Sequence, residues 1–292
     1  MFTKSLPATV LFPRKSNVFS GVLVGVVLFA VSVLVFYLAY GVAASGSAAS
    51  TDSAAPLRLG VVDGPEAEVL EFVRREQLKD TLEITFYRDA SAVRQALVKG
   101  EIDGASFENN VTLLNARKNP DFPLASVGLT ISLPLAFYSQ KLSRLDELRP
   151  GSRVVISAEP EAQGRALLLL YHYGLIMFDS ALGPAVRLSD VTKNPREIVL
   201  VARPDAELSV ELSNADLVAL GYQAARQVGR APARHSLAME DAFSPFAQVL
   251  TIVEADREKL SSKLEEFWGA YRSTSVKKFI RTHFEDSVRR PW

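Results

Sequence analysis

The stretch AEPEAQGRALLLL, residues 158–170, places Arg165 at the start of an apolar run that spans residues 164–174. The run predicts a helix with Arg165 in its first turn, where a cation is unfavourable by about 0.3–1 kcal/mol unless something compensates. A ligand carboxylate would compensate, because free backbone N–H groups and a forked guanidinium together bind an anion. An ion pair with Glu159 or Glu161 on the protein surface would do so equally well.

Other patterns of catalytic or metal-binding chemistry are missing from the sequence. His172, His235 and His283 do not cluster with carboxylates at ligand spacing, and no glycine-rich phosphate loop or serine-nucleophile motif occurs. The chain has no cysteine, which excludes disulfides, thiolate metal sites and lipid attachment through cysteine. We therefore expect no enzyme, no metal and no cofactor. Asp63-Gly64-Pro65 fits either a plain strand-to-helix turn or the lining of a cleft.

The elements that must position Arg165 alternate between strand and helix from Leu57 onward. The expected strands are 57–62, 82–87, 102–107, part of 122–139, 153–157, 198–202, 215–220 and 248–254. The expected helices are 66–77, 91–100, 108–119, the run after residue 164, and two closing helices at about 255–270 and 273–285. This alternation predicts an α/β fold with parallel sheets covered on both faces. The formal net charge of zero argues against a nucleic-acid partner.

The N-terminal segment has the features of a membrane anchor. No charged residue occurs between Lys15 and Asp52, and residues 18–44 exceed the roughly 20 apolar residues that span a bilayer. Basic residues precede this segment, so the positive-inside rule places residues 1–17 in the cytoplasm and the bulk of the chain outside the cytoplasmic (inner) membrane. A signal peptide cleaved after Ala44 is the alternative, although its apolar core would usually be shorter.

A flexible linker is expected to follow the anchor. Residues 45–56 are small and polar, as linkers are, and the exported domain then occupies residues 57–292.

Several ordered stretches resemble one protein family. These are LGVVDGPEAEVLE, LVKGEIDGASF, LASVGLTISLPLAFYSQKLSRLDELRPGSRVVIS, GRALLLL, DVTKNPREIVLV and the closing VRRPW. From about Leu57 to Trp292 the chain is similar to the NlpA/MetQ family, the methionine-binding lipoproteins of bacterial ABC importers. The resemblance implies a two-lobed periplasmic-binding-protein fold of type II, with a hinge and an interlobe cleft. Lobe one would comprise about 57–137 plus 245–292, and lobe two about 138–244.

The resemblance also implies a ligand site. Its positions here are Arg165, Phe107, Asn109, Thr112, Gly221, Gln248 and Ala90. Arg165 matches the family arginine that grips the amino-acid carboxylate, and Phe107 matches a phenylalanine of the site. The other positions depart from the family: its histidine and tyrosine are replaced by Asn109 and Thr112.

The remaining three positions depart from the family as well. Gly221 and Gln248 stand where the family has asparagines, and Ala90 stands where it has a tyrosine. The carboxylate grip is therefore expected to persist with an altered specificity.

Function follows from the resemblance as an expectation. The chain would be a membrane-tethered solute-binding protein that delivers a small carboxylate-bearing ligand, such as an amino acid, to an ABC permease and ATPase. Its tether would be the hydrophobic segment 18–44, because the acylated cysteine of the family is missing. The alternative is a structural or regulatory adaptor that keeps the fold and does not transport.

Overall fold

The computed structural model describes residues 55–292. The predicted segments 1–17 and 18–44, and most of the linker 45–56, lie outside the described residues. Within the part of the chain that is described, no helix combines the length and the apolar character needed to span a membrane. The chain divides into two compact units, and the second, Ser53–Trp292, holds all the elements discussed below.

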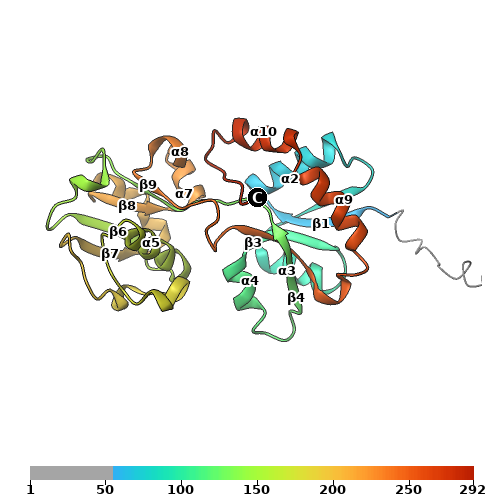
Figure 1. Ribbon diagram of the computed structural model, residues 1–292, viewed down its shortest axis with the longest axis horizontal. Helices are drawn as coiled ribbons and strands as arrows, with labels where there is room; N and C mark the ends of the chain where they lie inside the picture. Colours follow the sequence, from blue (N-terminus) through green and yellow to red (C-terminus); the bar gives the residue numbers. More distant parts are fainter. Residues whose placement is uncertain (1–54) are drawn as a thin grey trace, which may run out of the picture. The chain divides into compact units, whose positions relative to one another are not determined.

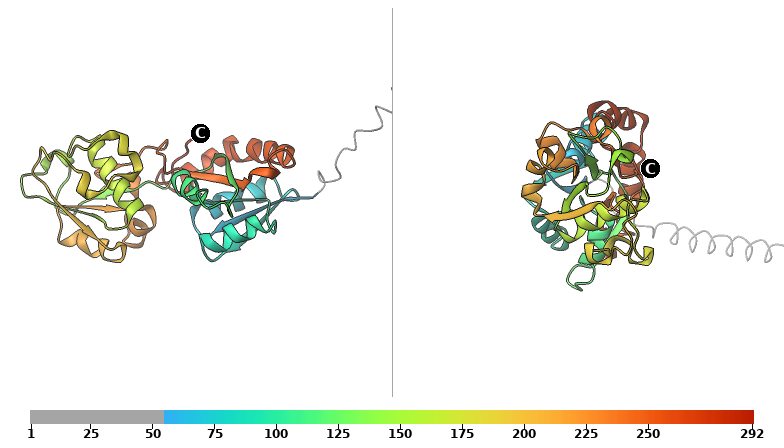
Figure 2. Two further views of the ribbon diagram at one scale, coloured as in Figure 1. Left: turned by 90° about the horizontal axis from the view of Figure 1, so that it is seen from below. Right: turned by 90° about the vertical axis from the view of Figure 1, so that its left-hand side faces the viewer.

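The first lobe is built on a five-stranded sheet in the order β2-β1-β3-β10-β4, with helices on both faces (Figures 1 and 2). Its elements are β1 (Leu57–Val62), α2 (Pro65–Glu76), β2 (Leu82–Tyr87), α3 (Ala90–Val98), β3 (Gly104–Asn109), α4 (Asn110–Ala116), β4 (Leu124–Leu129), β10 (Gln248–Val253), the 3-10 turn η6 (Glu254–Asp256), α9 (Ser261–Tyr271) and α10 (Thr274–His283). In α2 a proline occupies the first turn, and acidic residues precede basic ones, which suits the helix dipole.

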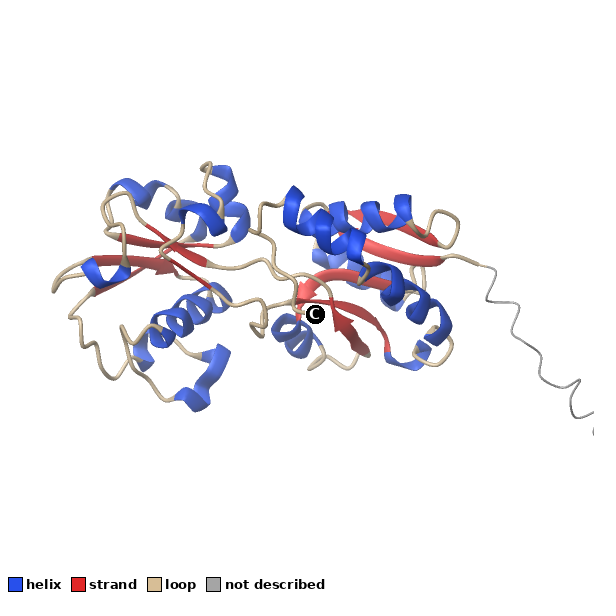
Figure 3. Ribbon diagram, turned by 45° about the horizontal axis from the view of Figure 1, so that its top comes forward, coloured by secondary structure: helices blue, strands red, loops and turns tan. Residues whose placement is uncertain are grey.

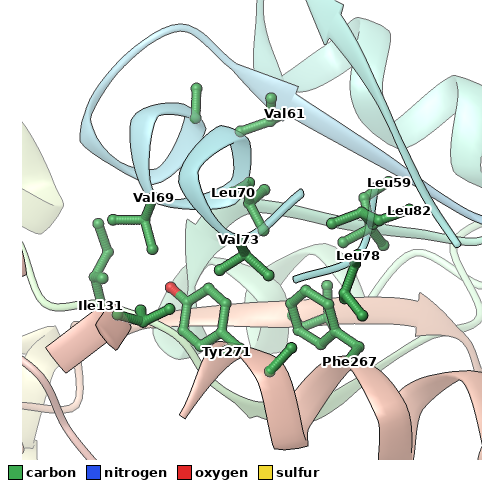
Figure 4. Packing of buried hydrophobic residues seen from close by; sticks show 14 of the residues in the cluster. Leu59, Val61, Val69, Leu70, Val73, Leu78, Leu82, Ile131, Phe267 and Tyr271 are labelled. Atoms are coloured by element: carbon green, nitrogen blue, oxygen red, sulfur yellow. The ribbon is translucent and has the colours of Figure 1, made fainter. Parts of the chain in front are cut away.

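The main core of this lobe lies between the sheet and α2, α9 and α10. Leu59 and Val61 of β1 pack against Leu70 and Val73 of α2 and against Phe267 of α9 (Figure 4). A smaller core under α3 and α4 covers the other face of the sheet. Both faces are therefore closed, and the free ends of the strands are left to build a site.

The second lobe repeats the arrangement with the sheet order β7-β6-β8-β5-β9. Its elements are β5 (Ala136–Tyr138), η2 (Leu145–Glu147), β6 (Arg153–Ser157), α5 (Pro160–His172), η3 (Ser180–Ala185), η4 (Leu188–Asp190), β7 (Val199–Arg203), α6 (Asp205–Leu208), η5 (Val210–Ser213), β8 (Leu217–Leu220), α7 (Tyr222–Gln227), α8 (Pro232–His235) and β9 (Ala238–Met239). One core lies under α5 and the other under α6 and α7. Together the lobes form the two-lobed α/β arrangement that the resemblance implies.

The chain passes between the sheets from β4 to β5 and from β9 to β10, through the loops visible in Figure 3. The segment near the C-terminus joins this hinge, since Ser132 and Arg289 exchange backbone hydrogen bonds of 2.8 and 2.9 Å. The strands that arrive from the other lobe, β10 and β5, pair antiparallel with their neighbours. The expectation of purely parallel sheets was therefore wrong, because a strand that enters from the hinge runs against the others.

Helix α5 begins four residues earlier than the apolar pattern predicted. Pro160 stands at its first turn, and Glu159 precedes it as the N-cap residue. Proline suits this position because its missing N–H has no partner there in any helix. Arg165 consequently lies in the second turn, so the expected conflict with the helix N-terminus is small. Gly164 is needed for close packing, because a side chain there would collide with the Pro184 carbonyl.

Candidate functional site

The carboxyl ends of the parallel strands gather the site residues at one edge of each sheet. In lobe one, Asp63 follows β1, Ala90 lies just beyond β2 and Asn109 ends β3. In lobe two, Asp205 follows β7 by two residues and Gly221 follows β8 directly. In open α/β sheets this edge is where ligands bind, which makes the two edges the candidate site.

Arg165 is held by a carboxylate of the protein itself. Its Nε donates to Glu240 at 3.0 Å and its Nη2 donates to the second oxygen of Glu240 at 2.5 Å. Nη2 also donates to the Leu133 carbonyl at 2.9 Å. The guanidinium lies over the Phe246 ring, 5.0 Å from its centre. The side chains of Arg165 and Glu240 are only 16% and 7% exposed, so the ion pair is nearly buried.

This pair fastens α5 to both connections between the lobes. Leu133 precedes β5 on the first connection, and Glu240 follows β9 on the second, where it also accepts a 2.8 Å hydrogen bond from the Leu135 backbone. The surface pairing of Arg165 with Glu159 or Glu161 that the sequence allowed is not the one adopted. Among the hydrogen bonds of the described residues, none uses Nη1 of Arg165, so this nitrogen is available to a ligand.

A cavity of about 360 Å³ lies at the carboxyl edge of the second sheet. Its lining includes Arg165 and Gly221, two of the predicted site residues, together with Ser157 and Asp205. The Ser157 hydroxyl donates a short hydrogen bond to Asp205. A side chain added at Gly221 would meet open space.

An adjoining cavity of about 400 Å³ shares Tyr222 and Gln223 with the first. Asp63 and Gly64 line it from lobe one. Of the two interpretations left open for this turn, the cleft lining is the one the structure supports. Gly64 has a φ of 144°, and Gln223 of lobe two approaches to 3.2 Å from where a side chain would begin.

A third, more apolar cavity of about 640 Å³ is larger but fits the predicted site less well. Arg165 and Glu240 line it together with Tyr171, Phe243 and Phe246. It contains neither Gly221 nor a residue that follows β7, so it does not lie at the carboxyl edge. We therefore take the smaller pair of cavities as the candidate ligand site.

Asn109 and Thr112 bind a carboxylate of the opposite lobe. Asn109 Nδ2 donates to Glu161 at 2.7 Å, and the Thr112 hydroxyl donates to its other oxygen at 2.8 Å. The Asn109 oxygen meanwhile accepts from the Thr112 backbone at 2.9 Å and so caps α4. We call Glu161, Asn109 and Thr112 the interlobe clasp, because it joins α5 of lobe two to β3 and α4 of lobe one.

Removing the clasp is expected to change the separation of the lobes. Glu161→Ala loses both hydrogen bonds, and each bond to a charged group contributes about 1.5–3 kcal/mol. The population of molecules with separated lobes should therefore rise roughly a hundredfold or more relative to the clasped form. The measurement is the distance between spin labels at Lys79→Cys and Arg149→Cys, which the absence of native cysteines makes unambiguous. Glu159→Ala, an exposed neighbour, is the control. Unchanged distances in Glu161→Ala would show that the clasp holds nothing.

The other predicted residues of lobe one lie near the clasp. Gln248 pairs with Asn109 across β10 and β3, and its side-chain oxygen is buried without a hydrogen-bond partner among the described residues. Phe107 packs into the smaller core of lobe one, with the Arg94 guanidinium 5.5 Å from its ring centre. Ala90 is the first residue of α3, where Asp89 is the N-cap. None of these three lines the two cavities described above.

Four side chains of the candidate site could not be assigned to it from the sequence. They are Glu240, Glu161, Ser157 and Asp205. Asp205 had a local signal, because it comes directly after a strand and a proline, as Gly221 comes after the next strand. Glu240 had none, since its partner Arg165 is 75 residues away in the chain. No group of histidine, cysteine and acidic side chains suited to a metal ion occurs within residues 55–292.

Comparison with known proteins places residues 57–292 in one family. Residues 57–292 match the family described as NlpA lipoprotein. A D-methionine-binding lipoprotein MetQ from Yersinia pestis is 32% identical over 241 residues, which cover 81% of this chain and 88% of the relative. The corresponding protein of Escherichia coli K12 is 31% identical with the same coverage.

Solved structures agree with the fold. The crystal structure of a methionine-binding protein, MetQ, superimposes with a TM-score of 0.64 at 29% identity and covers 81% of this chain and 98% of its own. A periplasmic substrate-binding protein of an ABC transporter from Coxiella burnetii gives 0.65 at 27% identity, with 80% and 99% covered. A nutrient-binding protein from Burkholderia cenocepacia bound to methionine gives 0.65 at 25% identity, with 81% and 100% covered.

Proposed function

The chain belongs to the NlpA lipoprotein family, and from that membership we propose that it is the solute-binding protein of a bacterial ABC importer, with an amino acid or a similar small molecule as ligand. The observation that carries the proposal is the cavity at the carboxyl edge of the second sheet, lined by Arg165 and Gly221. The relatives' names describe binding proteins rather than enzymes, and several name methionine, which makes methionine the first candidate.

The proposed contacts follow the positions that the resemblance implied. Arg165 offers Nη1 to the ligand from lobe two, beside Gly221. Phe107, Asn109, Thr112, Gln248 and Ala90 are the proposed contacts from lobe one, although none of them lines the two cavities. Thioether contacts with aromatic rings are worth about 0.3–1.5 kcal/mol each, and two such rings are replaced by Asn109 and Thr112. Methionine is therefore expected to bind more weakly here than in its relatives.

Two measurements test this proposal. The first is stabilisation of the protein by amino acids, and the second is a gain of ligand affinity in the variant Gly221→Asn. An amino acid at a hundredfold its dissociation constant should stabilise the full-length protein by about 2.7 kcal/mol in a thermal melt. Gly221→Asn adds an amide in open space at a backbone φ of −69°, which asparagine tolerates. One further hydrogen bond of about 0.5–1.5 kcal/mol should tighten binding roughly two- to tenfold.

The control for this variant is Gly269→Asn, because Gly269 is also a glycine with open space around it but lies in α9. If L- and D-methionine and the other amino acids all leave the melting temperature unchanged, the solute-binding proposal is wrong.

The tether is proposed to be residues 18–44. The absence of any cysteine supports this, because an acylated cysteine cannot serve, and a spanning helix holds a protein more firmly than acyl chains do. The full-length protein is expected to stay in the membrane fraction after alkaline carbonate washing, with its N-terminus intact. A soluble form that begins near Ser45 would contradict the anchor and favour the cleaved signal peptide.

A structural or regulatory adaptor is the second candidate function. Two observations favour it: Glu240 occupies two donors of Arg165, and Glu161 occupies both Asn109 and Thr112. Each of these groups would otherwise be available to a ligand. An adaptor would keep its partner proteins in a pull-down from membranes while releasing no small molecule on denaturation.

A further inference from the structure

The charge of the ligand cavity is set by two side chains. Arg165 and Asp205 are the charged residues that line it, and their formal charges cancel. Arg165, however, already has a carboxylate partner in Glu240 just outside the lining, at 3.0 and 2.5 Å. The Arg165–Glu240 pair is neutral as a unit, so the charge that the cavity presents to a ligand is the negative charge of Asp205.

Unlike Arg165, Asp205 has no side-chain partner of opposite charge among the hydrogen bonds and ion pairs of the described residues. Its carboxylate accepts a hydrogen bond from the neutral Ser157 hydroxyl. A neutral hydroxyl donates one hydrogen bond without cancelling the charge, whereas an ammonium would do both. A ligand carboxylate, by contrast, would have to share Arg165 with Glu240 at close range, and like charges repel.

The adjoining cavity points in the same direction. It adds the carboxylates of Asp63 and Glu68 to the same part of the cleft, beside Glu285, which is paired with Arg234 at 3.2 Å. Its cation Arg226 balances only one of them, and His283 is already hydrogen-bonded to Glu68 at 2.5 Å.

We propose that the cleft recognises the ammonium group of its ligand through Asp205, so that its ligands are cationic amines, including amino-acid amides and diamines, and need no carboxylate. This inference rests on the proposed function, because it names the ligand class of the same site. Asp205 would then be the residue that determines specificity, and Arg165 would chiefly hold the hinge.

The test uses three forms of one molecule with the full-length protein in detergent at about pH 6.5, where an α-amine is protonated. L-Methionine carries both charges, L-methioninamide keeps only the ammonium, and N-acetyl-L-methionine keeps only the carboxylate. 1,4-Diaminobutane is added as a cation without the side chain. Binding is measured by calorimetry for the parent, Asp205→Asn and Glu207→Gln. Glu207 is the control, because it is an exposed acid on the same helix, α6, outside the cavity.

The expected result is that the amide binds at least as tightly as methionine, that N-acetylmethionine does not bind, and that Asp205→Asn weakens the amide tenfold or more while Glu207→Gln does not. Binding of methionine and N-acetylmethionine without the amide would overturn the inference and leave the proposed function standing. Equal binding of the amide by the parent and Asp205→Asn would also overturn it. Failure of all four compounds would remove the inference, and failure of the whole amino-acid series as well would remove the proposed function.

Discussion

Glu240→Ala is expected to lower the free energy of unfolding by about 3–5 kcal/mol, because it leaves the nearly buried guanidinium of Arg165 without a counter-charge. The backbone N–H of Leu135 also loses its acceptor. The measurement is chemical denaturation followed by the fluorescence of Trp268 and Trp292, which lie in the described part of the chain.

Glu254→Ala is the matched control for this loss. Glu254 also pairs with an arginine, Arg257, but the two side chains are 51% and 47% exposed. Exposed pairs contribute about 0–1 kcal/mol, so the control should unfold almost like the parent. Equal effects of the two substitutions would contradict a buried Arg165–Glu240 pair. Arg165 variants will also be destabilised for the same reason, so their ligand affinities must be compared at temperatures where each variant is folded.

The second large effect is a loss of stability as the pH rises, and its source is the carboxyl group of Glu66. This side chain lies in the core of lobe one, 3% exposed, where Tyr271 donates to its two oxygens at 3.1 and 3.0 Å. Burial raises the pKa of Glu66 from 4.5 to about 8, and hydrogen bonds from Ser106, Tyr271 and Thr130 oppose the rise only in part. Folded Glu66 therefore keeps a proton that the unfolded chain has released over this range of pH.

Stability must then fall as the pH rises from about 4.5 to about 8, since the folded state binds more protons than the unfolded state. At about 1.4 kcal/mol for each pKa unit, this group removes up to roughly 5 kcal/mol across the window. Glu66→Gln, which cannot ionise, should match the parent near the lower end and be more stable by several kcal/mol at the upper end. Denaturation midpoints measured at intervals of pH test this.

Glu265→Gln is the control for this profile, because Glu265 is an exposed acid on α9, the same helix as Tyr271. It should keep the slope of the parent. If Glu66→Gln keeps that slope too, the carboxyl of Glu66 is not protonated in the folded protein.

Most strands of the fold could be predicted from the sequence because their residues carry the signal locally. The strands β1, β2 and β6 have the expected bounds, since short apolar or alternating runs are closed by turn residues. The start of α5 was missed because its first residues, Pro160 to Gln163, are mostly polar and only the later ones are apolar. The antiparallel pairing of β5 and β10 was not predicted. The direction of a strand relative to its neighbours depends on the path of the chain through the hinge, and no local sequence pattern records that path.

The candidate site was predictable to a smaller extent. The resemblance identified Arg165 and Gly221, which the structure brings to one cavity. The partners that decide their charge, Glu240 for Arg165 and Glu161 for Asn109, lie 75 and 52 residues away from them. A single sequence records which residues are acidic, but it does not record which of them the hinge will place beside an arginine.

The position of β10 determines when each lobe can be completed during synthesis. In the first sheet β10 lies between β3 and β4, so these two strands have no common neighbour until residues 248–253 have been made. The second sheet uses only strands between residues 136 and 239, all of which emerge earlier. The lobe that begins first is therefore finished last, and while it waits for β10 it presents unpaired strand edges, the kind of surface that aggregates or recruits chaperones. Because the chain is synthesised from its N-terminus, the nascent first lobe is the part that needs protection from aggregation.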